Sequence, residues 1–271
     1  MTKYIPKRII NGHTHYHPGE LERVAERWKA AGLKKTCVCA WCEPNNAEVL
    51  ACHKRFPDLV VPFGYVDLYE PDPDQVDRLR DEGFTGLKFI TTPRPYSDER
   101  FMPIYERAEK LNMPAVFHTG WVASEKPVRS LNMHPAELEP IARAFPNFKI
   151  VAAHLGNWWA EDAVGIMQHH KNVWFDLSGG FIRTLAPSKL RSLFLRQPDK
   201  NLRTLDEVVD YNLFKKIVFA TDNPPLEELL EFYVNLMTWL EVPIDIQKGV
   251  YYDTMAGILG MQDAVAQAAG N

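Results

Sequence analysis

Short runs of apolar and β-branched residues alternate with amphipathic stretches along the chain. Apolar side chains spaced three and four positions apart, as at Leu21, Val24, Ala25 and Trp28, predict a helix, whereas short continuous apolar runs predict buried strands. We expect eight strands, at residues 8–15, 36–41, 60–66, 85–90, 114–119, 149–154, 172–178 and 216–221. Strands that alternate with helices are typical of a parallel sheet built from β/α units.

Further helical patterns fill the spaces between and after these strands, at residues 49–56, 98–111, 135–145, 158–170, 226–240 and 254–269. Helix-breaking residues such as Gly32, Pro57 and Gly83 stand at the joins. Eight β/α units without a break in composition predict an α/β fold, a single (β/α)8 TIM barrel over residues 1–271. The connection 179–215 is too long for one simple helix and predicts an extra helix or a lid.

Composition and charge exclude several classes of protein. The 271 residues carry a net charge of −4 without a basic stripe, so a nucleic acid is not an expected partner. We expect no signal peptide and no membrane span, because no apolar segment approaches the required length, and hence a cytoplasmic location. The cysteines Cys37, Cys39, Cys42 and Cys52 lack a second closely spaced pair for a zinc site and are predicted to be core thiols.

Polar, metal-competent side chains recur where the predicted strands end. His13 and His15 share one face of the first strand and can grip one ion from the same side. Similar residues end strands four, five, six and eight, and the carboxyl ends of barrel strands converge on the face where active sites lie. Any one of them has an ordinary explanation; Asp222, for example, would suit a helix N-cap. The predicted cluster is His13, His15, Lys88, His118, His154 and Asp222.

The segments around these residues carry a resemblance to a known family. Gly86-Leu87-Lys88, Phe117-His118-Thr119-Gly120, Ala153-His154-Leu155-Gly156, residues 220–224 and residues 256–260 resemble the amidohydrolase superfamily, and more narrowly its amidohydrolase 2 branch. That branch includes hydrolases, lactonases and non-oxidative decarboxylases related to aminocarboxymuconate semialdehyde decarboxylase. The chain departs from the pattern at Asn11, where the family usually has an aspartate two residues before the first histidine.

The resemblance implies a divalent metal, usually zinc, in one of two arrangements. With one ion, the ligands are His13, His15, His118 and Asp222, and His154 is a catalytic base or substrate contact. With two ions, Lys88 is carboxylated and bridges them, while His118 and His154 bind the second. A plain Lys88 ammonium that binds a substrate carboxylate stays an equal alternative. In either arrangement Asp222 acts as general base and then acid toward a metal-activated water.

Large aromatic and basic residues follow several strand ends and predict the pocket wall. Trp41, Trp121, Trp158, Arg94 and Arg183 suit a planar or apolar small molecule that bears a carboxylate. Alternatively, the tryptophans pack loops and the arginines are solvated.

Three functions follow from this set of residues. The leading hypothesis is a metal-dependent hydrolase of an ester, lactone or amide bond in a small carboxylated substrate. The alternatives are a metal-dependent non-oxidative decarboxylase of an aromatic or muconate-like acid, and a non-catalytic metal-binding barrel. The expected partner is a small-molecule substrate, and a homodimer is left open.

Overall fold

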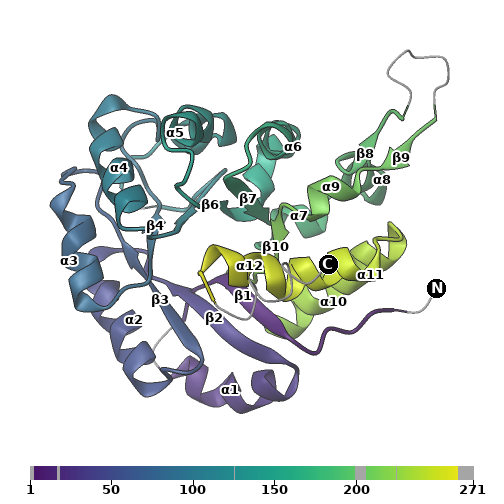
Figure 1. Cartoon of the computed structure of the whole chain (residues 1–271), viewed down its shortest axis with the longest axis horizontal. Helices are drawn as coiled ribbons and strands as arrows, with labels where there is room; N and C mark the ends of the chain where they lie inside the picture. Colours follow the sequence, from purple (N-terminus) through teal and green to yellow (C-terminus); the bar gives the residue numbers. More distant parts are fainter. Residues whose placement is uncertain (1–2, 17–18, 125, 199–205, 224, 262–271) are drawn as a thin grey trace.

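The computed structural model describes residues 3–16, 19–124, 126–198, 206–223 and 225–261 (Figure 1). Eight parallel strands, all at the expected places, form one sheet in the order β1-β2-β3-β4-β5-β6-β7-β10 and confirm the TIM-barrel fold. The strands are β1 Ile9–Thr14, β2 Leu33–Cys39, β3 Val60–Tyr65, β4 Gly86–Phe89, β5 Ala115–Phe117, β6 Ile150–Ala152, β7 Val173–Asp176 and β10 Ile217–Val218.

The barrel closes along a seam between β1 and the segment that follows β10. Gly12 N donates to Phe219 O at 2.8 Å and Thr221 N donates to His13 O at 3.1 Å. The side-chain amide of Asn11 bridges the same seam. It donates to Thr221 Oγ1 at 2.8 Å and accepts from Thr221 N at 3.1 Å. An amide can donate and accept at once, whereas an ionised carboxylate can only accept. Asparagine at this position therefore suits the seam.

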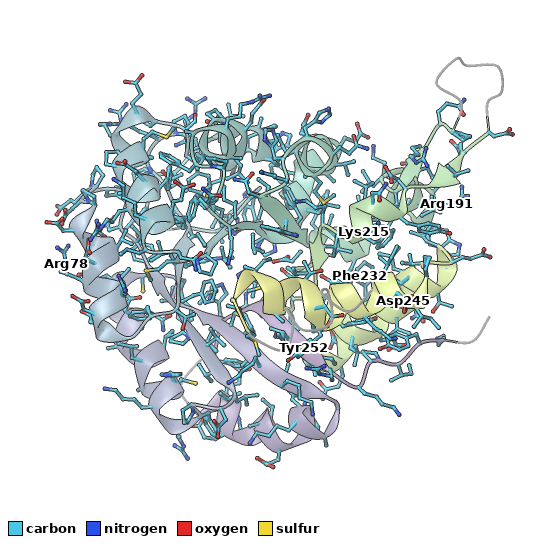
Figure 2. All side chains as sticks on the ribbon, in the orientation of Figure 1. Arg78, Arg191, Lys215, Phe232, Asp245 and Tyr252 are labelled. Atoms are coloured by element: carbon cyan, nitrogen blue, oxygen red, sulfur yellow. The ribbon has the colours of Figure 1, made fainter. Side chains whose placement is uncertain are left out.

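Helices pack around the outside of the sheet and precede or follow each strand in turn. These are α1 Glu20–Ala30, α2 Glu43–Arg55, α3 Asp74–Glu82, α4 Met102–Lys110, α5 Leu138–Ala144, α6 Ala160–His169 and α10 Leu226–Trp239. Short turns η1 Glu99–Phe101, η3 Pro135–Glu137 and η4 Ala153–Trp159 begin three of the expected helical regions, and η2 Ser130–Met133 lies in the β5–α5 connection. Charged side chains such as Arg78 on α3 and Asp245 near the C-terminal end of the described chain lie at the periphery (Figure 2).

The C-terminal part of the described chain closes the bottom of the barrel. It comprises α11 Ile244–Lys248, the π-turn η5 Gly249–Asp253 and α12 Thr254–Ile258, whereas residues 262–269 of the expected helix lie outside the described residues. Met255 and Ile258 pack against the barrel interior, where Cys37, Cys39 and Val116 are buried. The four cysteines are free thiols; Cys42 and Cys52 are only partly buried. The interior is thus a packed core, and the open end of the barrel lies at the opposite, carboxyl face.

The long connection 179–215 folds into several short elements. It contains α7 Phe181–Thr184, α8 Pro187–Ser192, α9 Tyr211–Phe214 and an antiparallel hairpin of β8 Leu195–Arg196 and β9 Val208–Val209. The hairpin projects away from the barrel (Figure 1). In the described part of this connection, residues 179–181 line the main cavity, so lid closure by the rest of it stays a prediction. None of the helices in the described residues combines the length and the apolarity that a membrane crossing requires.

Candidate metal centre and active site

The two histidines at the end of β1 each turn one ring nitrogen toward the other. The Nε2 atoms of His13 and His15 lie 3.2 Å apart. Each Nδ1 atom has an acceptor of its own, because His13 Nδ1 lies 3.2 Å from Asp176 Oδ2 and His15 Nδ1 lies 2.6 Å from Cys39 O. When Nδ1 carries the ring proton, Nε2 keeps its lone pair. Both rings therefore present a lone pair to the space between them.

Asp222 brings a carboxylate to the same space across the barrel seam. Its backbone N donates to His13 O at 2.9 Å, and its backbone O accepts from His15 N at 3.2 Å. Its Oδ1 atom lies 3.7 Å from His13 Nε2 and 3.6 Å from His15 Nε2. A point equidistant from three atoms with these separations lies about 2.0 Å from each, which matches zinc–nitrogen and zinc–oxygen bonds of about 2.0–2.2 Å. The spacing of the three ligand atoms therefore fits a divalent metal ion.

Two further histidines border this triad. One ring nitrogen of His154, one ring nitrogen of His13 and one carboxylate oxygen of Asp222 all lie within 4.8 Å of one another. His154 Nδ1 is held by Ser178, at 3.0 Å from Oγ and 3.3 Å from O, which leaves Nε2 free. In His118 it is Nε2, and not Nδ1, that has a hydrogen-bond partner, because it lies 3.0 Å from Trp121 O. Its ring centroid lies 4.9 Å from that of His154, so His118 joins the cluster beside His154.

Lys88 lies beneath the cluster and is fully buried. Its Nζ atom lies 2.8 Å from His13 Nε2, and among the described residues no carboxylate comes within ion-pair distance of it. Burial lowers the pKa of the amine, which favours the neutral form that reacts with carbon dioxide. Lys88 is also absent from the described residues that line the cavity, which argues against a direct contact with a substrate carboxylate.

Burial and nearby positive charge keep His13, His15 and His118 neutral. Burial is the main cause that lowers the pKa of His13 well below its usual value, and the charge of Lys88 is the second. The same two causes, in the same order, lower the pKa of His15 to about 4. For His118, burial and then His154 lower the pKa. Burial tends to raise the pKa of Asp222, but electrostatic interactions with His154, the two β1 histidines and Lys88 outweigh it and hold that pKa below its usual value. Neutral imidazoles beside an ionised carboxylate are the ligand forms that a metal requires.

The cluster forms part of the floor of a cavity of about 840 Å³ at the carboxyl face. His15, His118, His154 and Asp222 line it, as do Trp41, Trp121 and Trp158 on its walls. The wall also includes Tyr65 and Phe181. A mainly aromatic enclosure with a few convergent polar groups is typical of a small-molecule site.

The structure does not bring the two predicted arginines to this cavity. Arg94 is exposed and lies 3.9 Å from Asp98 Oδ2, and Arg183 lies 3.3 Å from Glu228 Oε2. Neither is among the described residues that line the cavity, because each side chain pairs with a nearby acid instead. Lys126 is the one lysine or arginine in the described lining, and it was not expected from the sequence. A lone lysine in a loop gives no signal in sequence.

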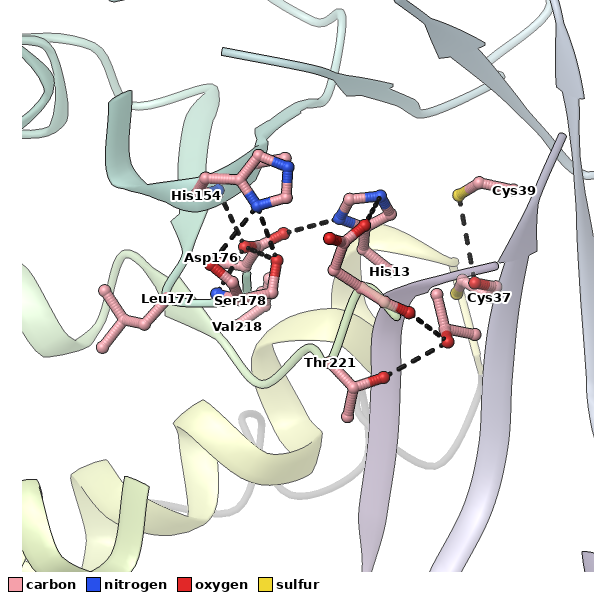
Figure 3. Close-up of polar contacts among 12 residues, drawn as sticks. His13, Cys37, Cys39, His154, Asp176, Leu177, Ser178, Val218 and Thr221 are labelled. Carbon is pink, nitrogen blue, oxygen red and sulfur yellow. Dashed lines mark hydrogen bonds and ion pairs between the residues drawn. The ribbon is translucent and has the colours of Figure 1, made fainter. Parts of the chain in front are cut away.

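Asp176 was also missed, although its signal was present. It ends the apolar strand β7, as the other candidates end theirs, and is fully buried. Its carboxylate contacts His13 and Ser178 directly beside the metal-competent group (Figure 3). It therefore acts on the ligands rather than as one of them.

Several site residues have left-handed backbone conformations. Asp222 has φ 58° and His154 has φ 68°, and β-branched Thr91 on the cavity wall has φ 54°. Such conformations are costly for residues other than glycine and concentrate at functional sites. The hydrogen bonds of the seam and of Asp176 hold two of them in place.

A family model described as Amidohydrolase matches residues 20–261. The chain belongs to the amidohydrolase family. Members of this superfamily typically depend on a metal and are enzymes, which agrees with the neutral histidines and the carboxylate at the strand ends of this amidohydrolase. A search of curated proteins finds no significant match.

Solved structures with the same fold cover nearly the whole amidohydrolase chain. An uncharacterized TIM-barrel protein from Bordetella bronchiseptica is 16% identical with a TM-score of 0.68, covering 97% of this chain and 99% of its own. The 2,6-dihydroxybenzoate decarboxylase from Rhizobium is 13% identical with a TM-score of 0.64, covering 94% and 99%. A probable 2-pyrone-4,6-dicarboxylic acid hydrolase from Acinetobacter baumannii is 13% identical with a TM-score of 0.62, covering 94% and 100%. At these identities the likeness shows the fold alone.

Proposed function

We propose that this amidohydrolase is a metal-dependent hydrolase of an ester, lactone or amide bond in a small carboxylated molecule. The observation that carries the proposal is the position of Asp222. Its carboxylate lies within 3.7 Å of both His13 Nε2 and His15 Nε2 and also lines the cavity. Hydrolysis needs such a base between metal and substrate, whereas a protein that only binds metal does not.

The chain's own residues supply the remaining chemistry. His13, His15 and Asp222 would hold a divalent ion, with zinc as the first candidate, and a second ion would bind only if Lys88 is carboxylated. When bound, the ion would lower the pKa of a water and polarise the scissile carbonyl. Asp222 accepts the proton of the attacking water and returns it to the leaving group. His154 presents Nε2 to the cavity, where it accepts a hydrogen bond from a substrate hydroxyl or takes up a proton.

The cavity walls favour a flat or apolar substrate with one anionic group. Trp121 and Trp158 are about half exposed, at 50% and 58%, and offer ring faces at the rim. Lys126 can pair with a carboxylate that reaches this rim. We therefore assign the carboxylate contact to Lys126 in place of the two arginines.

The aromatic walls equally favour a second candidate, non-oxidative decarboxylation of an aromatic or muconate-like acid. In that reaction the same residues orient the substrate and a protonated group delivers a proton to the carbanionic carbon. The two reactions differ in their products, since hydrolysis incorporates solvent oxygen and decarboxylation releases carbon dioxide.

The test is a screen of esters, lactones, amides and aromatic acids with the wild type and Asp222→Asn, each with measured metal content. For a hydrolase we expect solvent ¹⁸O in the product and a loss of about 10²–10⁴-fold in kcat for Asp222→Asn. Release of carbon dioxide without ¹⁸O incorporation would establish the decarboxylase instead. Unchanged hydrolysis in metal-loaded Asp222→Asn would contradict the assigned base. Tight metal binding with no turnover across the screen would favour the non-catalytic barrel.

A further inference from the structure

The carboxylate of Asp176 divides its two oxygens between two histidines of the cluster (Figure 3). Oδ2 lies 3.2 Å from His13 Nδ1. Oδ1 accepts three hydrogen bonds, from His154 N at 2.9 Å, from Ser178 N at 2.9 Å and from Ser178 Oγ at 2.5 Å. Both side chains of the His13–Asp176 pair are fully buried, so water does not compete for these contacts.

These contacts fix where the ring protons lie. An ionised carboxylate can only accept, so His13 Nδ1 must carry the proton that points at Asp176. Ser178 has a single hydroxyl hydrogen and gives it to Asp176, so its oxygen can only accept from His154 Nδ1, 3.0 Å away. His154 therefore carries its proton on Nδ1 as well.

We propose that Asp176 is the positioning residue that sets the tautomers of both histidines, His13 directly and His154 through Ser178. Its effect is to leave Nε2 of each ring as an acceptor that faces the cluster. This inference rests on the proposed metal site for its functional meaning, but the tautomers themselves can be measured without metal. Acceptors behind metal-binding histidines typically change metal affinity by about 10–100-fold.

Asp176→Asn tests the assignment with almost no change in shape. Three donors converge on Oδ1, so the amide oxygen must take that place. The amide NH₂ group then faces His13 Nδ1, which must become an acceptor and shift its proton to Nε2, where the buried amine of Lys88 accepts the hydrogen bond in its neutral form. The variant should keep the backbone contacts of the β7 turn and lose the His13 lone pair at the cluster.

The matched control is Asp210→Asn. Asp210 is also buried, and its carboxylate also accepts from the backbone N two residues later, at Asn212, but it caps α9 away from the cluster. A structural role in a turn would affect both variants alike. A positioning role affects the cluster in Asp176→Asn only.

The experiment combines ¹⁵N NMR of the ring nitrogens in metal-free protein with Zn²⁺ affinity measured against a chromophoric chelator. We expect Nδ1–H on His13 in the wild type and in Asp210→Asn, and Nε2–H in Asp176→Asn, with Zn²⁺ affinity lowered at least tenfold in that variant alone. Unchanged His13 tautomer and Zn²⁺ affinity in folded Asp176→Asn would overturn the proposal. If that variant fails to fold, the wild-type spectrum decides, because Nε2–H on His13 there overturns the assignment directly. A wild type that binds no Zn²⁺ contradicts the proposed function, while the spectra still test Asp176.

Discussion

Lys88 Nζ lies 2.8 Å from His13 Nε2, and both side chains are fully buried. Because His13 holds its ring proton on the Asp176 side, the lysine donates to the lone pair that would otherwise bind a metal. The amine and an ion at the triad therefore compete for the same nitrogen. Carboxylation of Lys88 or its deprotonation would weaken this competition, because each removes the positive charge of the donor, and the lowered pKa of this buried amine favours both.

The metal-free protein should lose stability in mild acid. The usual histidine pKa is 6.5, whereas burial and then Lys88 hold that of His15 at about 4 in the folded chain. Between these values the unfolded chain binds a proton that the folded chain does not, so the free energy of unfolding falls as the pH falls. His15 alone accounts for about 3 kcal/mol over this window.

The measurement is chemical denaturation of chelator-treated protein from pH 7 to pH 4.5, with His15→Gln as the control. Asp222 adds to the loss only below its usual pKa of 3.8, outside this range. The slope should be smaller in His15→Gln. A free energy of unfolding that is flat between pH 6.5 and 4.5 in the wild type would contradict the low pKa of His15.

Gly120→Ala should destabilise the protein strongly. Gly120 follows β5 with φ 100°, and a Cβ atom there would lie 2.2 Å from Asn157 Cβ. Backbone strain and overpacking together predict a loss of about 3 kcal/mol or more in the free energy of unfolding. Gly165→Ala is the control, because this glycine lies inside α6 with open space around its Cβ position and should gain about 0.5–1 kcal/mol. Equal thermal stability of the two variants would refute this packing argument.

Lys126→Met should raise KM for a carboxylated substrate by about tenfold or more, since a charge-assisted hydrogen bond is worth about 1.5–3 kcal/mol. Arg94→Met serves as the control, because Arg94 lies with Asp98 outside the cavity and its loss should leave KM unchanged. Steady-state kinetics on the substrate found in the screen make the comparison. A larger effect at Arg94 than at Lys126 would return the assignment to the arginine.

The sequence was sufficient for the barrel and for the residues at the strand ends. An apolar strand imposes the direction of its last side chains, so His13, His15, His118, His154 and Asp222 could be placed on one face from sequence alone. The close approach of the His13 and His15 Nε2 atoms, at 3.2 Å, could not be predicted from sequence. It depends on hydrogen-bond acceptors for the two Nδ1 atoms that other strands supply.

Other features were hidden for different physical reasons. Helix α3 was not expected because only Val76 and Leu79 are buried on it, which leaves too thin an apolar stripe to recognise. The arginines were misplaced because long side chains on loops turn toward whichever acid lies nearest, and sequence spacing does not show which one that is. Asp176 shared the strand-end signal but was not singled out, since a lone acid there resembles a turn residue.

Metal content tests the central claim most directly. The measurement is elemental analysis of protein purified without chelator or added metal, comparing the wild type with His15→Ala, Lys88→Ala and the exposed-site control His169→Ala. We predict one or two divalent metals per chain in the wild type and in His169→Ala, and a clear loss of metal in His15→Ala. Two metals per chain that fall on loss of Lys88 would identify the carboxylated-lysine arrangement, whereas one metal that persists in Lys88→Ala would identify the single-ion site. A wild type without metal, or a metal content unchanged in His15→Ala, would contradict the account.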